Sequence, residues 1–281
     1  MIDKSVLVTG ASSGIGYNTA VYLSKIGYTV LASVRKEENA TKLGLENLKP
    51  IWPLDLTISE QIDAIGNTII KEIEHKEIPA LYSIINIAGG GQIAPIELMD
   101  ISEFRNELEK RIIGPVHLLQ ILLPFLRKTK GRILWIATPG LIPISYLTDI
   151  HASDFAVNYI ARTLNLELYP DGIRNILIRC GGIKTTSPER TINKLKQMIS
   201  EWDPERLAPY KNRLLRFIEA QTKFDASRTE PMEVAKLIGK VLEVKKPKVR
   251  YQVGHLSKMA AFLEKLPQSW VDYIMEKKES K

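Results

Sequence analysis

The sequence predicts an α/β protein with a doubly wound parallel sheet of about seven strands and helices on both faces. Three observations support this fold class. A glycine-rich turn at residues 9–16 lies between an apolar run (5–8) and an apolar-periodic segment that extends to Ile26. Apolar strand-like runs alternate with helix-like segments as far as residue 180. The run 80–86 is almost continuously apolar, as expected of a strand buried on both faces.

The alternation assigns six strands before the pattern changes. We expect strands at 5–9, 29–34, 49–54, 80–86, 131–137 and 173–180, with helices at 14–26, 37–43, 58–73, 102–126 and 149–168. The fourth helix is expected to break near Pro124, because proline removes a helical N–H. Repeated strand–helix–strand units imply parallel strands joined by right-handed crossovers.

The segment 183–229 interrupts this alternation. It is long and polar, and it carries one or two amphipathic helices, at 192–202 and 207–219. Because it follows the end of a strand, where ligands bind in open α/β sheets, we expect a substrate lid; a passive packing excursion is the alternative. A helix at 230–244 and a strand at 248–253 follow, and 255–281 forms a helical appendage. We expect residues 1–281 to form one domain.

Composition limits the classes of function. The 281 residues carry a net charge of +7, but the lysines are scattered, so nucleic-acid binding is not expected. No apolar run of about 18 residues predicts a transmembrane segment, and no signal peptide is recognised. The single cysteine, Cys180, excludes an intramolecular disulfide and fits a cytoplasmic, reducing location. No metal site is expected.

The glycine-rich turn predicts a dinucleotide site. Gly10 allows a sharp turn, Gly14 allows backbone to approach a pyrophosphate, and Gly16 allows the helix to pack closely on the strand. The helix N-terminus offers free N–H groups and a positive dipole end to the anion. The remaining members of the predicted cofactor turn are Ser12, Ser13 and Ile15.

Residues 9–16 read Thr-Gly-Ala-Ser-Ser-Gly-Ile-Gly, and this motif resembles that of the short-chain dehydrogenase/reductase family, whose fold is of the Rossmann type. The resemblance covers almost the whole chain. Leu266-Pro267 and the stretch 270–273 are similar to the retinol- and steroid-dehydrogenase branch. The resemblance implies a dinucleotide cofactor and further cofactor contacts at Asp55, Leu56, Asn86, Ala88, Gly89, Gly181, Ile183 and Thr185.

Three of these segments match family patterns with changes. Asp55-Leu56 corresponds to the acidic residue at the adenine ring. The stretch 86–89 matches Asn-Asn-Ala-Gly with Ile87 as the second residue. The stretch 181–185 resembles the Pro-Gly-x-x-x-Thr segment that borders the nicotinamide, with Cys180 where proline is usual.

The end of the second strand indicates the cofactor. Members that prefer NAD carry an acid there, whereas this chain has Arg35 and Lys36 before Glu37. A guanidinium at Arg35 pairs well with a 2′-phosphate, so NADP(H) is favoured over NAD(H). The alternative is that these cations are only a solvated start of a helix.

The resemblance also locates the family's proton relay, and most of it is missing. Ile150 stands in place of the catalytic Tyr and Asp154 in place of the Lys one helical turn later. Thr138 replaces the Ser that polarises the carbonyl, and Arg111 replaces the Asn of the long helix. Isoleucine has no proton to relay, and aspartate reverses the charge that would activate a phenol.

The two charge changes suggest a hypothesis: Arg111 and Asp154 form an ion pair across the former relay. Two residues could replace the tyrosine as proton carriers. Tyr146 precedes Ile150 by the number of residues in one helical turn, and the sequence leaves open whether it lies in the helix or in a loop. Asp154 itself is the other candidate. His151 is predicted to point away from the helix face that carries Ile150, and an isolated histidine is more often structural than catalytic. Cys180 has two alternative interpretations. It is either a nucleophile or, as is more common for a cysteine in such a place, a small buried apolar residue.

Two classes of function follow. The first is an NADP(H)-binding enzyme that acts on a hydrophobic small molecule by a non-standard mechanism, as an atypical oxidoreductase or a non-redox isomerase or cyclase. The second is a catalytically inactive relative that serves as a cofactor sensor or as the partner subunit of an active one. The family resemblance implies a homodimer or homotetramer, formed through the helices at 102–126 and 149–168.

Overall fold

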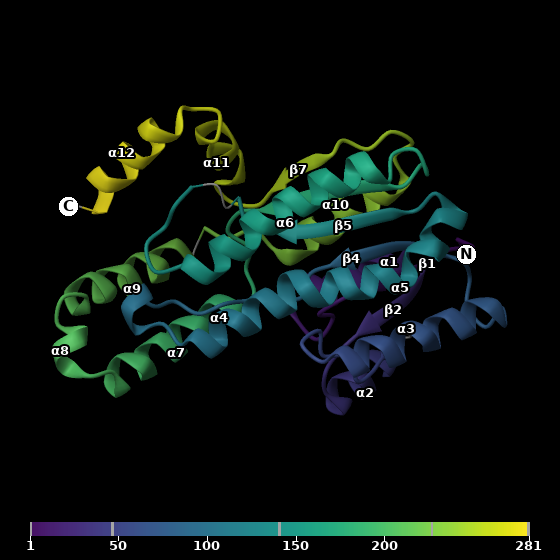
Figure 1. Ribbon diagram of the computed structural model, residues 1–281, viewed down its shortest axis with the longest axis horizontal. Helices are drawn as coiled ribbons and strands as arrows, with labels where there is room; N and C mark the ends of the chain where they lie inside the picture. Colours follow the sequence, from purple (N-terminus) through teal and green to yellow (C-terminus); the bar gives the residue numbers. More distant parts are fainter. Residues whose placement is uncertain (1, 46–47, 140–141, 226, 280–281) are drawn as a thin grey trace.

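Seven parallel strands form one sheet in the order β3-β2-β1-β4-β5-β6-β7 (Figure 1). The computed structural model describes residues 2–45, 48–139, 142–225 and 227–279. The strands are β1 (Ser5–Val8), β2 (Thr29–Ser33), β3 (Lys49–Ile51), β4 (Leu81–Asn86), β5 (Arg132–Ala137), β6 (Arg174–Cys180) and β7 (Arg250–Val253). The predicted doubly wound fold is confirmed, although β3 is three residues shorter than expected.

Helices cover both faces of the sheet, and each face has its own apolar core. One core contains residues of α1 (Gly14–Lys25), α2 (Glu37–Leu45) and α10 (Pro231–Glu243). The other contains residues of α3 (Ser59–Glu74), α5 (Gly114–Thr129) and α6 (Thr148–Glu167). All residues of β1, β4 and β5 are buried, which explains why their sequences are nearly continuously apolar.

The expected break near Pro124 is wrong. α5 continues through Pro124 to Thr129. Pro124 and Gln120, whose carbonyl lies four residues earlier, are both exposed, so water can bind the carbonyl that proline leaves free. The long helix is interrupted earlier instead, where a π-helical turn (Glu109–Ile113) joins α4 (Ile101–Leu108) to α5.

The segment after β6 folds as three helices, α7 (Thr186–Glu201), α8 (Pro204–Leu207) and α9 (Lys211–Asp225). They extend away from the sheet beside α4 and share a third apolar core with Ile93 and Tyr146 (Figure 1). A short 3₁₀ turn (Ile96–Leu98) packs near α8.

Two helices end the chain, α11 (Ser257–Leu263) and α12 (Gln268–Glu279). α11 packs against β7, whereas α12 projects from the body beyond it (Figure 1). Within the described ranges, no helix is both long and apolar enough to cross a membrane.

The strand order positions the functional site. β1 lies between β2 and β4, so connections leave in opposite directions beyond its carboxyl end. This reversal is the point at which open α/β sheets bind ligands. Thr9, Asn86, Thr138 and Gly181 lie at or just after the carboxyl ends of β1, β4, β5 and β6.

Candidate cofactor and active site

The turn after β1 has the backbone shape that a dinucleotide site needs. Gly10 and Gly14 have positive φ angles of 68° and 55°, which favour glycine. A Cβ on Gly16 would lie 2.1 Å from the carbonyl oxygen of Gly10, so helix and turn can pack this closely only around glycine. Ser13 precedes α1 without a side-chain cap, which leaves the N–H groups of the first turn available to an anion.

Thr9 joins this turn to the loop after β4. The backbone N–H groups of Ile87 and Ala88 donate to the Thr9 hydroxyl oxygen at 2.9 and 3.3 Å. A Cβ on Gly10 would lie 3.0 Å from the Cα of Ala88. The predicted cofactor residues at 9–16 and 86–89 are therefore neighbours in the structure.

Asn86 offers an unused polar group at the carboxyl end of β4. The residue is 6% exposed, yet neither its amide nitrogen nor its amide oxygen has a hydrogen-bond partner. A buried amide without partners carries a desolvation cost that a ligand's hydroxyl groups would remove.

Arg35 and Asp55 lie beyond the carboxyl ends of β2 and β3, the two strands next to β1 on one side of the sheet. The Arg35 guanidinium, which is 67% exposed, approaches the Asp55 carboxylate at 3.7 Å. The second oxygen of Asp55 accepts hydrogen bonds from the backbone N–H and the hydroxyl of Thr57, at 3.0 and 2.9 Å. Leu56 is buried, and its carbonyl oxygen lies 2.0 Å from where a Cβ on Gly114 would be. The acid is therefore fixed while the arginine stays accessible.

The loop after β6 closes over the turn. Gly181 donates its N–H to the Val253 carbonyl at 2.8 Å, and Ile183 is buried. Thr185 precedes α7, and its methyl group would be 3.1 Å from a Cβ on Gly14. Of the three sequence-predicted residues of this loop, Thr185 therefore lies against the glycine turn, at the start of the helical insertion.

Arg111 and Asp154 form a buried ion pair, as the sequence hypothesis proposed. Nη2 of Arg111 contacts Oδ1 of Asp154, and the side chains are 12% and 1% exposed. Arg111 comes from the π-helical turn and Asp154 from α6. Burial lowers the pKa of the Arg111 guanidinium, and the nearby Glu107 opposes this. The guanidinium stays cationic at neutral pH.

Thr138 is bound to the same carboxylate. Its backbone N–H donates to Oδ2 of Asp154 at 2.9 Å, and its hydroxyl also donates to that oxygen. A hydroxyl has only one proton to donate. Because Asp154 already receives it, Thr138 has no proton left with which to polarise a substrate carbonyl.

A triple-glycine loop after β4 lies against this charged cluster. A Cβ on Gly89 would lie 2.0 Å from Cδ of Arg111. The N–H of Gly90 donates to Glu107 at 3.1 Å. A Cβ on Gly91 would lie 2.4 Å from a carboxylate oxygen of Asp149. Glycines therefore make room for the charged side chains.

Sequence reasoning missed Glu107 and Asp149. Glu107 is 1% exposed and pairs with Lys110 at 3.2 Å and with Arg111 at 3.8 Å. Asp149 accepts the N–H of Gln92 at 2.8 Å, and burial raises the pKa of its carboxyl group. The sequence did contain a signal for Glu107, because an acid four residues before an arginine lies next to it on a helix. It contained no comparable signal for Asp149.

The other candidate proton carriers lie in different surroundings. Tyr146 is in the turn before α6, at φ 70°, and its ring packs edge-to-face on Phe217 at 5.7 Å. It therefore belongs to the core of the helical insertion. Burial lowers the pKa of His151. Burial also raises the pKa of Cys180 to about 12, which favours the unreactive thiol.

Comparison with known proteins identifies the class to which this fold and site belong. Residues 4–196 match the family model described as short chain dehydrogenase. The chain is a member of the short-chain dehydrogenase/reductase family.

Particular relatives extend this assignment. The chain is 30% identical to the 3-amino-tetrahydro-pyrrolizinone reductase of Xenorhabdus hominickii over 90% of this chain and 88% of the relative. It is 28% identical to the 3-ketodihydrosphingosine reductase of Bacteroides thetaiotaomicron, over 98% and 97% of the two chains. It is 32% identical to mouse estradiol 17-beta-dehydrogenase 2 over 65% of this chain, but spans only 49% of that relative.

Solved structures share the fold. A short-chain dehydrogenase from Streptomyces avermitilis superposes with a TM-score of 0.76 at 21% identity, covering 99% of this chain and 98% of that one. ElxO with NADP bound gives a TM-score of 0.68 at 21% identity, over 89% and 95% of the two chains.

Proposed function

We propose that this protein binds NADP(H) and acts on a hydrophobic small molecule without the tyrosine–lysine relay of its family. The observation that carries the proposal is the contrast within one site: the glycine turn keeps its backbone geometry, whereas an ion pair between Arg111 and Asp154 stands at the relay. NADP, when bound, supplies or accepts a hydride. Among the solved relatives, ElxO carries NADP, which agrees with this choice of cofactor.

Different residues of the chain would bind different parts of NADP(H). The uncapped first turn of α1 would hold the pyrophosphate through its N–H groups. The exposed Arg35 would pair with the 2′-phosphate, and Asp55 would contact the adenine. The unpartnered amide of Asn86 would bond a ribose hydroxyl. Gly181, Ile183 and Thr185 would border the nicotinamide.

The substrate side is inferred from the helical insertion. Residues 183–229 follow β6 and carry their own apolar core, so we infer that they form a lid, with the appendage 255–281 beside it. The names of two relatives refer to a steroid and to a sphingoid compound, which supports a hydrophobic substrate. The proton donor would differ from the family's tyrosine. Tyr146, on the lid core, is the candidate donor, whereas Asp154, held as a carboxylate by Arg111, would act as a base.

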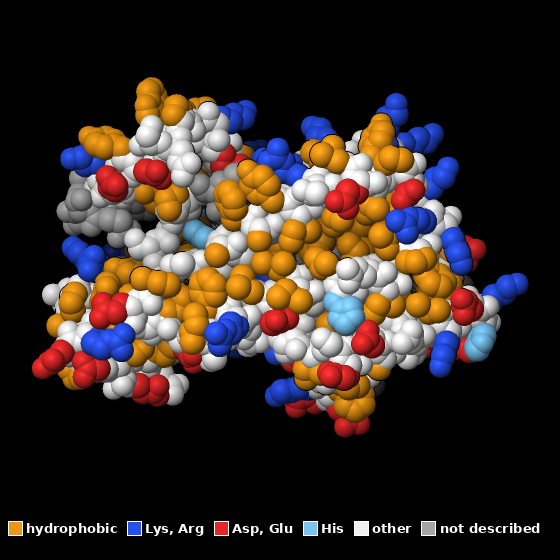
Figure 2. Space-filling view, viewed as in Figure 1, with side chains coloured by type: hydrophobic (Ala, Val, Ile, Leu, Met, Phe, Trp, Pro, Cys, Tyr) orange, Lys and Arg blue, Asp and Glu red, His pale blue; other side chains and the backbone are white. Residues whose placement is uncertain are grey.

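A second candidate is a cofactor-binding protein without catalysis, which senses the cofactor or joins an active relative. The commitment of the Thr138 proton to Asp154 favours it. So does the apolar surface over α5 and α6 (Figure 2). Phe155, Tyr159 and Leu166 of α6 are exposed, as is Ile113 at the end of the π-helical turn before α5. A homodimer or homotetramer formed through this face would serve either candidate.

Titration of the purified protein with NADPH and NADH tests the cofactor proposal. We expect NADPH to bind more tightly than NADH, by about tenfold, with the difference abolished in Arg35→Gln. Lys36→Gln, which removes a neighbouring exposed cation, is the matched control. Failure of both nucleotides to bind would reject the proposal. A bound complex in which only apolar side chains reach the nicotinamide would favour the non-catalytic candidate.

A further inference from the structure

The C-terminal helices α11 and α12 carry many of the exposed apolar side chains. Among the described residues, 18 large hydrophobic side chains are exposed, and six of them lie between residues 256 and 274. These six are Leu256, Met259, Phe262, Trp270, Tyr273 and Ile274. They belong to neither α5 nor α6, and α12 projects from the body of the molecule (Figure 1). Exposed apolar side chains gathered in this way mark a surface that binds a partner or a lipid.

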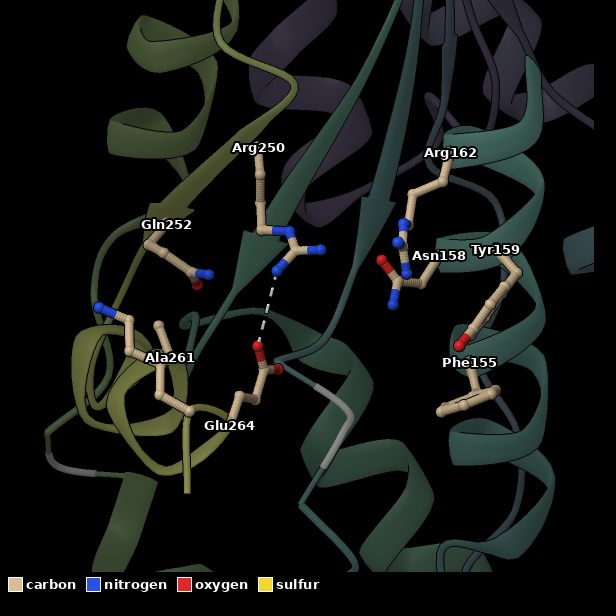
Figure 3. A pocket seen from close by; sticks show the side chains of 9 residues that line it. Phe155, Asn158, Tyr159, Arg162, Arg250, Gln252, Ala261 and Glu264 are labelled. Atoms are coloured by element: carbon tan, nitrogen blue, oxygen red, sulfur yellow. Dashed lines mark ion pairs between the residues drawn. The ribbon is translucent and has the colours of Figure 1, made fainter. Parts of the chain in front are cut away.

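α11 is fixed to the body by one of its sides. Glu264, at the end of the helix, forms an ion pair with Arg179, a buried residue of β6, and lies 3.8 Å from Arg250 of β7 (Figure 3). Ser257 and Ala260, which precede Glu264 by two turns and one turn, are also buried, so the three residues share the inner side of the helix. The acid at the end of α11 therefore points inward, and its charge is offset there.

The opposite side of α11 combines apolar side chains with cations. Met259 and Phe262 are 51% and 62% exposed, and their spacing of three residues places them on one side of the helix. Lys258 and Lys265, about one turn before and after Phe262, are exposed as well. The helix itself, residues 257–263, contains no acid. The outer side of α11 is therefore apolar and positively charged.

α12 has an outer side of the same composition. Four residues at the helical spacing i, i+3, i+4 and i+7 share one face: Trp270, Tyr273, Ile274 and Lys277. The three apolar residues are 63%, 60% and 44% exposed, and a hollow of about 360 Å³ lies against them. Asp272 and Glu276 lie about 120° or more around the helix from Trp270, so they are not part of this face.

We propose that the outer sides of α11 and α12 dock the protein on an anionic lipid surface. Aromatic and aliphatic side chains beside lysines are typical of helices that lie in the headgroup layer of a bilayer. The rings would enter the boundary between headgroups and acyl chains, while the lysines would reach the phosphate groups. The cations also disfavour a second copy of the chain as the occupant, because two such faces would bring like charges together.

Flotation of the whole protein with vesicles tests the docking. The vesicles contain either phosphatidylcholine alone or phosphatidylcholine with about one quarter phosphatidylglycerol. We expect binding to the mixed vesicles to be at least about fivefold tighter, and to weaken as salt is raised from about 0.05 M to about 0.5 M. The absence of binding to mixed vesicles would overturn the proposal, as would equal binding to both. No cofactor is needed, so the result is independent of the NADP(H) proposal.

Tyr273→Ser locates the contact. It should weaken binding to mixed vesicles by about tenfold, because the ring no longer leaves water. Tyr169→Ser is the matched control and should change binding by less than about twofold. Tyr169 is 61% exposed and lies under Arg174 as Tyr273 lies under Lys277, but it precedes β6, at the opposite end of the sheet. Equal effects of the two variants would overturn the assignment. So would a change of oligomeric state in Tyr273→Ser without lipid, since a second copy would then cover this face.

Trp270 gives a second readout of the same contact. Its side chain is 63% exposed, so its fluorescence emission should shift to shorter wavelengths when mixed vesicles are added. Trp270→Phe keeps an aromatic ring, so it should still bind the vesicles but lose this shift. A shift of equal size in Trp270→Phe would place the contact elsewhere on the protein and overturn the assignment.

Discussion

Arg111 of the π-helical turn and Asp154 of α6 meet as a buried ion pair beside the glycines that follow β4. A lone aspartate at this depth would be strongly disfavoured, and Arg111 supplies its counter-charge. Together, and with the Thr138 hydroxyl donating to the same carboxylate, they form a polar cluster in which each of the two charges has an opposite charge beside it. The charges of the two side chains therefore offset each other inside the site.

Gly16 can be tested for its place in the turn. In Gly16→Ala the new methyl group would overlap the Gly10 carbonyl, so we expect a loss of about 1–3 kcal/mol in the free energy of unfolding, with weaker NADPH binding. Gly44→Ala is the matched control, because no atom lies within 4 Å of its added Cβ. That control should gain about 0.5–1 kcal/mol as a helical glycine replaced by alanine. Similar behaviour of the two variants would contradict the close packing.

Thr138→Val removes the hydroxyl that bonds Asp154 and keeps the shape of the side chain. We expect a loss of about 1.5–3 kcal/mol in urea unfolding, the usual value for a hydrogen bond to a charged group. Thr68→Val, in an exposed helical position, should change stability by less than about 0.5 kcal/mol. If Thr138→Val were as neutral as this control, the hydroxyl would not be held by Asp154.

Asp149 should make stability depend on pH. Burial raises the pKa of this carboxyl in the folded protein, so the neutral form is favoured there. The stability it contributes is then fully present below the ordinary value of about 3.9 and is lost as pH rises through the folded pKa. The free energy of unfolding of wild type minus that of Asp149→Asn should fall as pH is raised from 4 towards 8. A flat or rising difference would contradict the burial effect.

Cys180 should behave as a buried neutral thiol. With its pKa near 12, the thiolate fraction at pH 8 is on the order of a thousandfold below that of free cysteine. Alkylation by iodoacetamide at pH 8 should therefore be slower by at least that factor in the native protein, and ordinary in urea. Native labelling at the rate of free cysteine would restore Cys180 as a candidate nucleophile.

Much of the fold could be predicted from sequence because its signals are local. The glycine-rich stretch 9–16 forms the turn between β1 and α1 that its sequence predicts. The apolar runs of β1, β4 and β5 reflect burial on both faces of the sheet. Pro124 misled the prediction, since whether a helix survives proline depends on whether water reaches the freed carbonyl. That exposure is a tertiary property.

The candidate site could be predicted only in part, for a similar reason. The reversed charges at 111 and 154 suggested the ion pair, because a family pattern aligned them. Asp149 accepts a hydrogen bond from the N–H of Gln92, which lies 57 residues earlier in the chain, and no local sequence pattern predicts such a contact.

The most direct test of the account is a double-mutant cycle on Arg111 and Asp154, measured as the free energy of unfolding in urea. We expect Arg111→Ala to lose about 3–5 kcal/mol, because it strands a buried carboxylate, and Asp154→Ala to lose less, because Glu107 still lies beside Arg111. The double variant should lose clearly less than the sum of the two. An Arg111→Ala protein with full stability, or strictly additive losses, would show that the relay has not been replaced by an ion pair.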